Sequence, residues 1–412
     1  PTPFATHWVI WQEMVTHLQD GHIAYLMGEI SYTGWWYYYP LTFLLKTPPP
    51  TLILLLAALL AGVKSAQRRW WDRRAIWLPA LLYGIAAISS NIDIGYRYLL
   101  VMLPFLYILC GGWLTKAKRN WQRWLTAAFI IWLMMSAALT FPHYLAYFNP
   151  VIAASDNEAA YLVDSNLDWG QGFIALDRWT EKHATQEPLF ISYYTFVDPT
   201  HYDLDYTPIA PAADAPPVLE QHFDPKPGTY AISATPLQGV MVAQEETHSW
   251  FRQREPIARP GNAIFVYEIP EEKNRPEWIA QCTVPVAPLS QEAIIEGFGQ
   301  ADLRQVTFDC TQSWVYPGGG RAAGQYALFL ETALADDVFI EQQLLDTSLS
   351  YEQKQAGVRP PFRLYARDVG PTQPHHTPDA TVQVGEALNF LGYTLQEQNI
   401  RPGEPLLVET YW

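Results

Sequence analysis

One apolar segment near the start of the chain constrains its fold more than any other feature. Aromatic residues open it, a lone lysine and three prolines follow, and an uninterrupted apolar run ends it, in GWWYYYPLTFLLKTPPPTLILLLAALLAGV, Gly34 to Val63. Trp and Tyr rings settle at the level of lipid headgroups, and a membrane-spanning helix needs about 20 mostly apolar residues. The segment therefore predicts chain entering a bilayer, with Lys46 near an interface.

The net charge of −15 hides two parts of opposite character. Residues 1–141 hold eleven Lys and Arg against five Asp and Glu, whereas the remaining 271 residues hold 15 against 36. Eleven of the 17 Trp also lie in residues 1–141, which fits anchoring at a membrane interface. The sequence therefore predicts a basic membrane part and an acidic part outside it, and the acidic charge argues against a nucleic-acid partner.

Four apolar segments follow one another and predict a transmembrane bundle of four spans. Their approximate bounds are 41–63, 76–90, 98–114 and 124–141. Their lengths are marginal to adequate for spanning. The alternative is a set of buried helices in a large soluble protein.

The connections between these segments predict the topology. The first, KSAQRRWWDRR, and the third, TKAKRNWQR, are rich in Lys and Arg, so the positive-inside rule makes both cytoplasmic. The middle connection, residues 1–40 and everything after about Pro142 then lie outside. We expect a multi-pass integral protein of the plasma (inner) membrane with extracytoplasmic C-terminal domains.

The rest of the chain predicts a multi-domain fold. Residues 142–270 combine a helical pattern at 172–183 with three strand-like runs, typical of a small α/β domain. Residues 278–370 read as a mostly β domain, and residues 380–412 as the start of a β-sandwich. Because the chain begins without Met and ends inside an apolar alternating run, we expect it to be an internal fragment of a longer protein.

The three cysteines divide into two kinds. Cys110 lies within an apolar run and reads as a small buried residue. Cys282 and Cys310 fall in a region predicted to lie outside, where oxidation is possible. A Cys282–Cys310 disulfide and two buried free thiols are both compatible with the sequence.

Four pieces of sequence, taken in order, carry a family resemblance. They are YLMGEISYTGWWYYYPLTFLLKTPPP, DIGYRYLLVMLPFL, FPHYLAYFNP and YLVDSNLDWGQG. Over about residues 20–185 the chain resembles the C-terminal half of bacterial GT-C membrane glycosyltransferases related to protein O-mannosyltransferases (glycosyltransferase family 39). The resemblance implies a multi-spanning enzyme that takes a sugar from a polyprenyl-phosphate donor and transfers it, with inversion, to an acceptor on the outer side.

The same resemblance places the catalytic carboxylate in the first external loop of the full protein, upstream of Pro1. The catalytic residues are therefore unknown in this chain, and we expect the fragment alone to be inactive. The acceptor, whether glycan, lipid or protein, is not identified. The alternative function is a membrane-anchored scaffold or a module that binds glycans or a partner without catalysis.

Two cations are the candidates for contact with the donor phosphate. Arg97 enters an apolar segment, where a charge is costly, and a guanidinium matches phosphate oxygens bidentately. The alternative is that Arg97 reaches the headgroups or pairs with Asp93, four residues earlier. Lys46 could meet a carrier phosphate where the next helix begins, or it could reach the interface as an ordinary boundary lysine.

Other residues are supporting or weak candidates. Tyr38 and Tyr39 belong to the aromatic belt or stack on the sugar. Asp164, Asp168 and Gln171 precede a helix, where they could do acid–base work or bind a sugar or a cation, or could form turns and a helix cap. Membrane lipids are expected partners. No cofactor is evident and no metal site is predicted, although a divalent metal is not excluded by the sequence.

Overall fold

The computed structural model describes most of the chain but not all of it. The described residues are 7–12, 21–64, 74–114, 119–151, 157–183, 185, 187–193, 202, 204–210, 222–271, 275–329, 338–354, 361–368, 374, 376–380, 382–385, 388–395 and 408–411.

The chain divides into two compact units. Unit 1 comprises Pro1–Leu219 and Pro227–Pro270, and unit 2 comprises Glu220–Lys226 and Glu271–Trp412. The finer division into five regions, at the boundaries expected from the sequence, stays a prediction.

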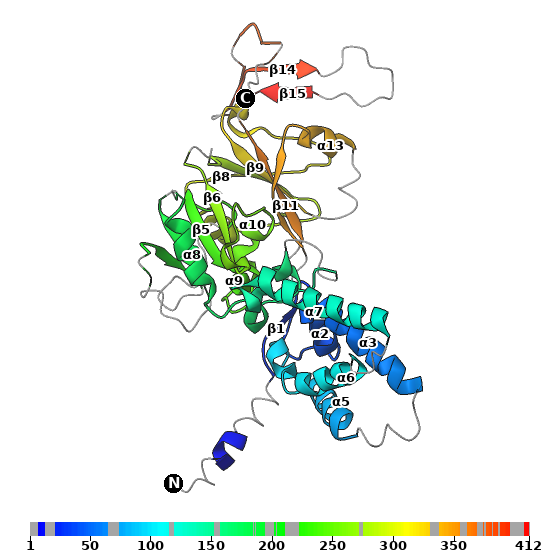
Figure 1. Cartoon of the computed structure of the whole chain (residues 1–412). Helices are drawn as coiled ribbons and strands as arrows, with labels where there is room; N and C mark the ends of the chain where they lie inside the picture. The colour runs from blue at the N-terminus through cyan, green and yellow to red at the C-terminus, as the bar shows by residue number, and fades with distance from the viewer. Residues whose placement is uncertain are drawn as a thin grey trace. The chain divides into compact units, whose positions relative to one another are not determined.

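In unit 1, a helix at residues 7–12 is followed by a β-hairpin and a group of helices (Figure 1). The hairpin strands are β1 (Ala24–Leu26) and β2 (Glu29–Ser31). The helices are α2 (Tyr38–Lys46), α3 (Pro49–Lys64), α5 (Arg74–Ile88), η1 (Tyr96–Leu99), α6 (Leu103–Leu114) and α7 (Asn120–Thr140). A small core of Leu54, Leu55 and Cys110, with Phe129 packed against it, joins α3, α6 and α7. Cys110 is thus the buried free thiol that the sequence predicts.

The prediction of a four-span bundle is wrong. In the described part of the chain, one helix, α7 with 21 residues, is long and apolar enough to cross a membrane, or two if the bent pair α2–α3 forms one span. Helix α5 has 15 residues and α6 has 12, which at about 1.5 Å per residue gives about 22 Å and 18 Å. Both are shorter than the hydrocarbon core of about 30 Å.

The first predicted span, 41–63, is broken by its prolines. Helix α2 ends at Lys46, and Thr47 takes extended backbone angles because a residue before proline avoids the helical region. Helix α3 starts again at Pro49, and the two axes differ by 119°. The apolar composition of the segment does not by itself predict this break. The basic connections at 65–73 and 115–118, on which the predicted topology depends, lie outside the described residues.

The remainder of unit 1 is an α/β layer. Its sheet has the order β4-β3-β5-β6 and is parallel except for the β5–β6 pair. The strands are β3, Leu189–Ser192, β4, Thr207–Ile209, β5, Gly228–Ser233, and β6, Ile264–Ile269. Helix α8, Gly172–Thr180, packs Phe173 and Leu176 against Ile191, Ala231 and Val266 of the sheet. The three predicted strands and the predicted helix are therefore present.

Unit 2 contains a five-stranded mixed sheet of order β10-β11-β9-β7-β8. The strands are β7, Trp278–Cys282, β8, Arg304–Phe308, β9, Gly324–Phe329, β10, Ser348–Gln353, and β11, Phe362–Arg367. Strand β7 pairs in parallel with both β8 and β9, and α11, Gln291–Phe298, lies between β7 and β8 in the chain. The region is therefore α/β, and the prediction of a mostly β domain is corrected, because parallel neighbours need a long crossover.

Two further features of unit 2 answer questions left by the sequence. Cys282 and Cys310, both fully buried, form a disulfide with Cα atoms 5.3 Å apart. In place of the start of a β-sandwich, the described residues beyond 380 form two separate antiparallel pairs. These are β12, Val382–Val384, with β13, Leu388–Phe390, and β14, Gly392–Leu395, with β15, Val408–Tyr411.

Candidate functional site

The candidate site lies in unit 1, where the segment before α6 meets the segment before α8. The backbone N–H of Tyr96 donates to Oδ1 of Asn166 at 2.8 Å, and Ser165 Oγ donates to the carbonyl oxygen of Ile94. A Cβ atom on Gly95 would lie 2.2 Å from Ser165 Oγ, so this close approach needs glycine. These hydrogen bonds and this close packing hold together the DIGYRY and DSNLDWGQ motifs, which are about 70 residues apart in sequence.

Arg97 is the exposed cation of this site. Its Cζ lies 5.0 Å from the ring centroid of Trp169 and 5.4 Å from that of Tyr98. The aromatic faces attract and orient the guanidinium. No hydrogen bond or ion pair joins Arg97 to any other residue that the structure describes, and Asp93 is not its partner. Its donor groups therefore remain available to a ligand.

Asp164 is a carboxylate that interacts electrostatically with Arg97. Burial raises the pKa of Asp164, and the charges of His22 and Arg97 oppose that rise. Its φ of 56° lies in the left-handed region, and its backbone N–H donates to Thr235 Oγ1 at 2.9 Å. The fold thus holds a half-buried carboxylate in the left-handed backbone region, within electrostatic range of the guanidinium. Backbone conformations of this sparsely populated kind cluster at functional sites.

Asp93 holds a turn. Its side chain is 1% exposed, and Oδ2 accepts a hydrogen bond from the backbone N–H of Trp35 at 2.6 Å. A Cβ on Gly34, whose φ is +70°, would come within 2.2 Å of the same oxygen. Oδ1 is buried without a hydrogen-bond partner among the described residues, and burial raises the pKa of Asp93 to about 6.

Lys46 lies inside unit 1. Its ammonium donates to the carbonyl oxygens of Leu145 at 2.8 Å and Asn166 at 2.7 Å, and it stands 4.2 Å from the centroid of the Phe148 ring. Only 8% of the residue is exposed. Lys46 therefore connects the end of α2 to two later segments of the chain. Of the two cations predicted to contact a donor phosphate, Arg97 remains the candidate.

The two candidate tyrosines are also enclosed. Tyr38 is 1% and Tyr39 is 3% exposed. The Tyr38 hydroxyl accepts from Nδ2 of Asn166 at 3.0 Å, and the Tyr39 hydroxyl donates to the carbonyl oxygen of Ile92. Both support the segments that carry Arg97 and Asp164, and neither presents a ring to solvent.

Asp168 and Gln171 form the turn that starts α8. Oδ1 of Asp168 accepts from the backbone N–H groups of Gly170 at 2.9 Å and Gly172 at 3.4 Å. Gln171 Oε1 accepts from the backbone N–H of Trp169, and its Nε2 donates to the carbonyl oxygen of Leu167. These contacts satisfy backbone groups at the helix start. Burial raises the pKa of Asp168 to about 6.

A buried Ser–His pair elsewhere in unit 1 does not form a site. Ser192 Oγ lies 2.8 Å from His248 Nε2, and both approach the carbonyl oxygen of Ala210. Both residues are 0% exposed, and burial lowers the pKa of His248 to about 3. A neutral, enclosed histidine without access to substrate reads as core structure. The described residues also contain no group of three or more His, Cys, Asp or Glu placed to hold a metal ion.

Trp169 and Asn166 are not among the candidate site residues predicted from the sequence. Trp169 supplies one of the two rings beside Arg97, and Asn166 joins Tyr38, Lys46 and Tyr96 through its side chain and its carbonyl group. Both residues belong to the DSNLDWGQ motif. Its high content of Asp and Asn, together with a Trp, is the sequence feature that could have indicated them. Its contact with the Arg97 segment is not local in sequence, so pattern alone could not show it.

Comparison with models of protein families, with curated proteins and with solved structures gives no match.

Proposed function

We propose that this chain is part of an integral membrane glycosyltransferase that uses a polyprenyl-phosphate-linked sugar, and that Arg97 contacts the donor phosphate. The observation that carries the proposal is the placement of Arg97: an exposed guanidinium beside two aromatic rings, with no ionic partner among the described residues. Its planar fork of N–H donors fits two phosphate oxygens. The family resemblance of the surrounding motifs supplies the reaction and the donor class.

The exposure of α7 supports a membrane location. Helix α7 has no buried residue, although a core helix of a soluble protein would bury its apolar face. Trp124, Met134 and Leu139 are 77%, 67% and 80% exposed. Apolar side chains in such number are stable when lipid or a partner covers them. We place α7 in the bilayer and the α/β segments that follow it on the outer side.

Asp164 is assigned a binding role. A carboxylate within electrostatic range of the phosphate-binding guanidinium can accept hydrogen bonds from sugar hydroxyls. Burial raises the pKa of Asp164, and the charges of His22 and Arg97 offset part of that rise. Asp93 and Asp168 are occupied by turns, so the described residues of this site provide no better carboxylate for this role.

The test is the donor dependence of sugar transfer by the full-length protein. With polyprenyl-phosphate-linked hexoses and pentoses as donors, Arg97→Gln should raise the donor KM about tenfold or more, because a charge-assisted bidentate contact is lost. Arg97→Lys should recover part of the loss. Arg304→Gln, an exposed arginine of unit 2, is the matched control and should leave the donor KM unchanged.

An unchanged donor KM in Arg97→Gln would remove Arg97 from the donor site. If no donor supports transfer by the wild-type protein, the enzymatic proposal fails, and the non-catalytic scaffold or binding module becomes the better account.

A further inference from the structure

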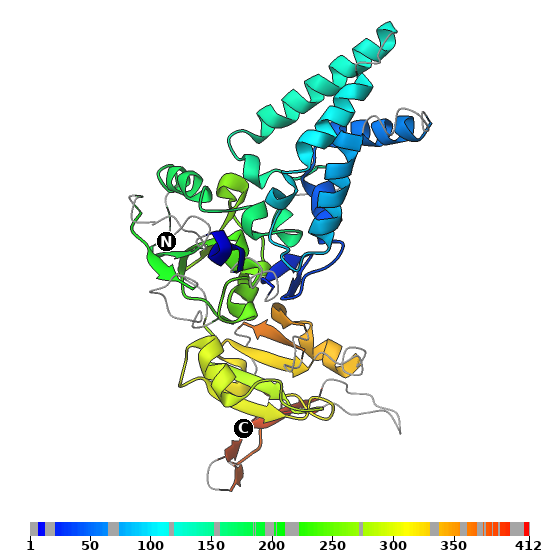
Figure 2. The same ribbon diagram turned by 90° about the horizontal axis from the view of Figure 1, so that it is seen from below.

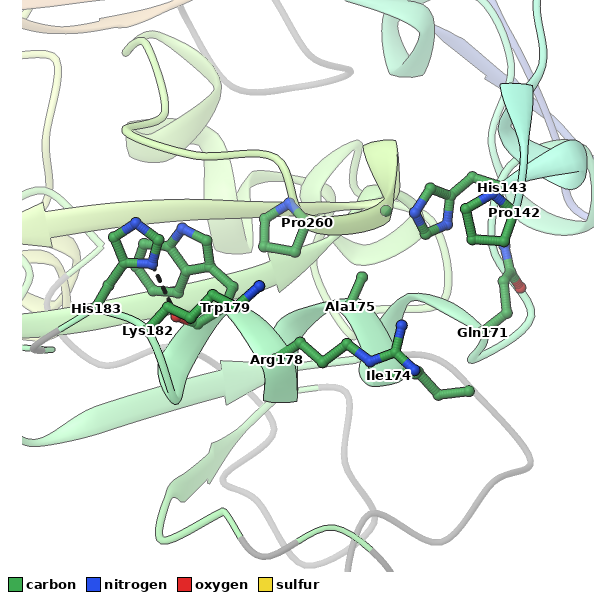
Figure 3. A pocket seen from close by; sticks show the side chains of 11 residues that line it. Pro142, His143, Gln171, Ile174, Ala175, Arg178, Trp179, Lys182, His183 and Pro260 are labelled. Carbon is green, nitrogen blue, oxygen red and sulfur yellow. Dashed lines mark hydrogen bonds between the residues drawn. The ribbon is translucent and has the colours of Figure 1, made fainter. Parts of the chain in front are cut away.

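A pocket that is lined by none of Arg97, Asp164 and Trp169 lies between the end of α7 and helix α8 (Figure 3). Its volume is about 590 Å³, enough for a small ligand or a lipid headgroup. One wall is the outer face of α8, and the other is made by Pro142 and His143 together with Pro260 and Gly261 of η7, Pro260–Asn262. Figure 3 shows Trp179 and His183 at one end and Pro142 and His143 at the other.

The charge of the pocket is of one sign. Arg178, Lys182, His143 and His183 all line it, and no carboxylate is among its lining residues, in a chain whose net charge is −15. No ion pair or side-chain hydrogen bond joins Arg178 or Lys182 to another described residue, and both are exposed. Two unneutralised cations that face one cavity favour an anionic ligand.

Apart from Gln171, the remaining lining residues are apolar. The rings of Trp179 and His183 stack with centroids 4.8 Å apart, and Nδ1 of His183 donates to the carbonyl oxygen of Trp179 at 2.8 Å. Ile174 is 48% exposed although it is a large apolar residue. The pocket therefore offers cations for an anionic group next to surface suited to glycerol and acyl carbons.

The position of the pocket in the fold indicates where the ligand comes from. Pro142 and His143 follow Thr140, the last residue of α7, by two and three positions. Phe141 and Tyr144 beside them are 69% and 55% exposed, and their rings contact each other edge to face. An aromatic pair at the end of an apolar helix is typical of the membrane interface, the depth at which phospholipid phosphates lie.

We propose that this pocket binds the phosphate-bearing headgroup of an anionic phospholipid and so seats the α/β part of unit 1 on the membrane surface. Arg178 and Lys182 contact the phosphate, and Ile174 and Trp179 contact the glycerol and upper acyl carbons. The inference rests on the membrane location of α7 in the proposed function, but it does not depend on sugar transfer.

The experiment measures lipid binding directly. The full-length protein in detergent is titrated with short-chain phosphatidylglycerol, and separately with short-chain phosphatidylcholine, glycerol 3-phosphate and inorganic phosphate, with calorimetry as the readout. The wild-type protein should bind phosphatidylglycerol at least about tenfold more tightly than phosphatidylcholine, because the two cations act on the net negative charge. The double variant Arg178→Gln, Lys182→Gln should lose that preference.

Two further variants sharpen the result. Ile174→Glu adds a carboxylate at an exposed lining position and should weaken phosphatidylglycerol binding without disturbing the core. The double variant Arg304→Gln, Arg321→Gln also removes two positive charges, but from exposed positions of unit 2. It should keep the wild-type preference for phosphatidylglycerol over phosphatidylcholine.

The proposal is overturned if the Arg178, Lys182 double variant retains the lipid preference, or if the unit 2 control loses it equally. Glycerol 3-phosphate or inorganic phosphate binding as tightly as phosphatidylglycerol would overturn the lipid assignment in favour of a soluble phosphate. A protein that fails to transfer sugar but keeps pocket-dependent lipid binding contradicts the proposed function while upholding this inference.

Discussion

At the scale of single residues, burial decides between roles that the sequence left open. Lys46 and Arg97 are both cations at the edges of apolar segments, yet the structure encloses the first among carbonyl groups and exposes the second beside aromatic rings. Asp168 is likewise enclosed, and accepting two backbone N–H groups is its evident role. A carboxylate in such a place resists ionisation because water no longer solvates its charge.

The raised pKa of Asp168 predicts a pH-dependent stability. The pKa of Asp168 is about 6 in the folded protein against an ordinary 3.8. Ionisation of Asp168 therefore destabilises the folded state fully above about pH 6 and not at all below about pH 4. Asp168→Asn keeps the acceptor oxygen and removes the charge. The variant should therefore be more stable than the wild type at pH 8, by up to about 3 kcal/mol, and equal to it at pH 4.

Thermal unfolding of the two proteins in detergent across this pH range measures the difference. Glu181→Gln, at an exposed position just beyond α8, is the matched control for the loss of one carboxylate. A stability difference between Asp168→Asn and wild type that does not change with pH would contradict the prediction.

At the scale of elements, the decisive contact joins η1 to the 3-10 turn η4, Asp164–Asn166. The two come from motifs that the sequence identified separately. Glycine at position 95 allows their approach, because a side chain there would occupy the space of Ser165 Oγ. The same contact presents Arg97 and Trp169 to each other, so local packing and the candidate site depend on one close approach.

This contact predicts a coupled pair of substitutions. Gly95→Ala should destabilise unit 1 by about 1 to 3 kcal/mol, because the new methyl group overlaps Ser165 Oγ, the atom 2.2 Å away. Ser165→Ala in the same protein removes that oxygen and should recover part of the loss. A double-mutant cycle on melting temperature gives the coupling energy, and strictly additive effects would show that the two segments do not press on each other.

At the scale of the whole molecule, the chain is two compact units, and the long apolar helices among the described residues belong to the first (Figures 1 and 2). In Figure 2, α7 is the long cyan-green helix. Unit 2 has a core built around Trp278, Tyr326 and the buried disulfide. Its stability therefore depends on a covalent link as well as on packing.

Loss of this link should be measurable within unit 2. The bridge closes a loop with a sequence separation of 28, so replacing both Cys282 and Cys310 by alanine should destabilise the unit by about 3 to 4 kcal/mol in the chain-entropy account. Hydrogen exchange of peptides from β7, β8 and β9 in the full chain should accelerate. The variant Cys110→Ala, at the buried free thiol of unit 1, is the control, and equal exchange in both variants would contradict a structural role for the bridge.

The sequence alone predicts the local features of this protein: the apolar segments, the helix over residues 172–180, three of the strands of unit 1 and the motifs that carry Arg97 and Asp164. Local propensity and periodicity are properties of neighbouring residues, so they can be read in one dimension. The sequence-based prediction failed at a local break that apolar composition does not show, and again where the outcome depends on contacts between distant segments. Prolines at positions 48–50 end one helix and bend the next away, and parallel pairing of β7 turns a supposed β domain into an α/β one.

The tertiary structure determines which charged groups are enclosed and which are exposed. Lys46 is satisfied by carbonyl groups about 100 and 120 residues away, and Arg97 meets Trp169 across more than 70. The pocket beside the end of α7 likewise gathers residues from three separate elements. Desolvation and pairing act through space. Residues that look alike in sequence therefore become enclosed structural groups, turn formers or exposed groups, according to what the fold packs around them.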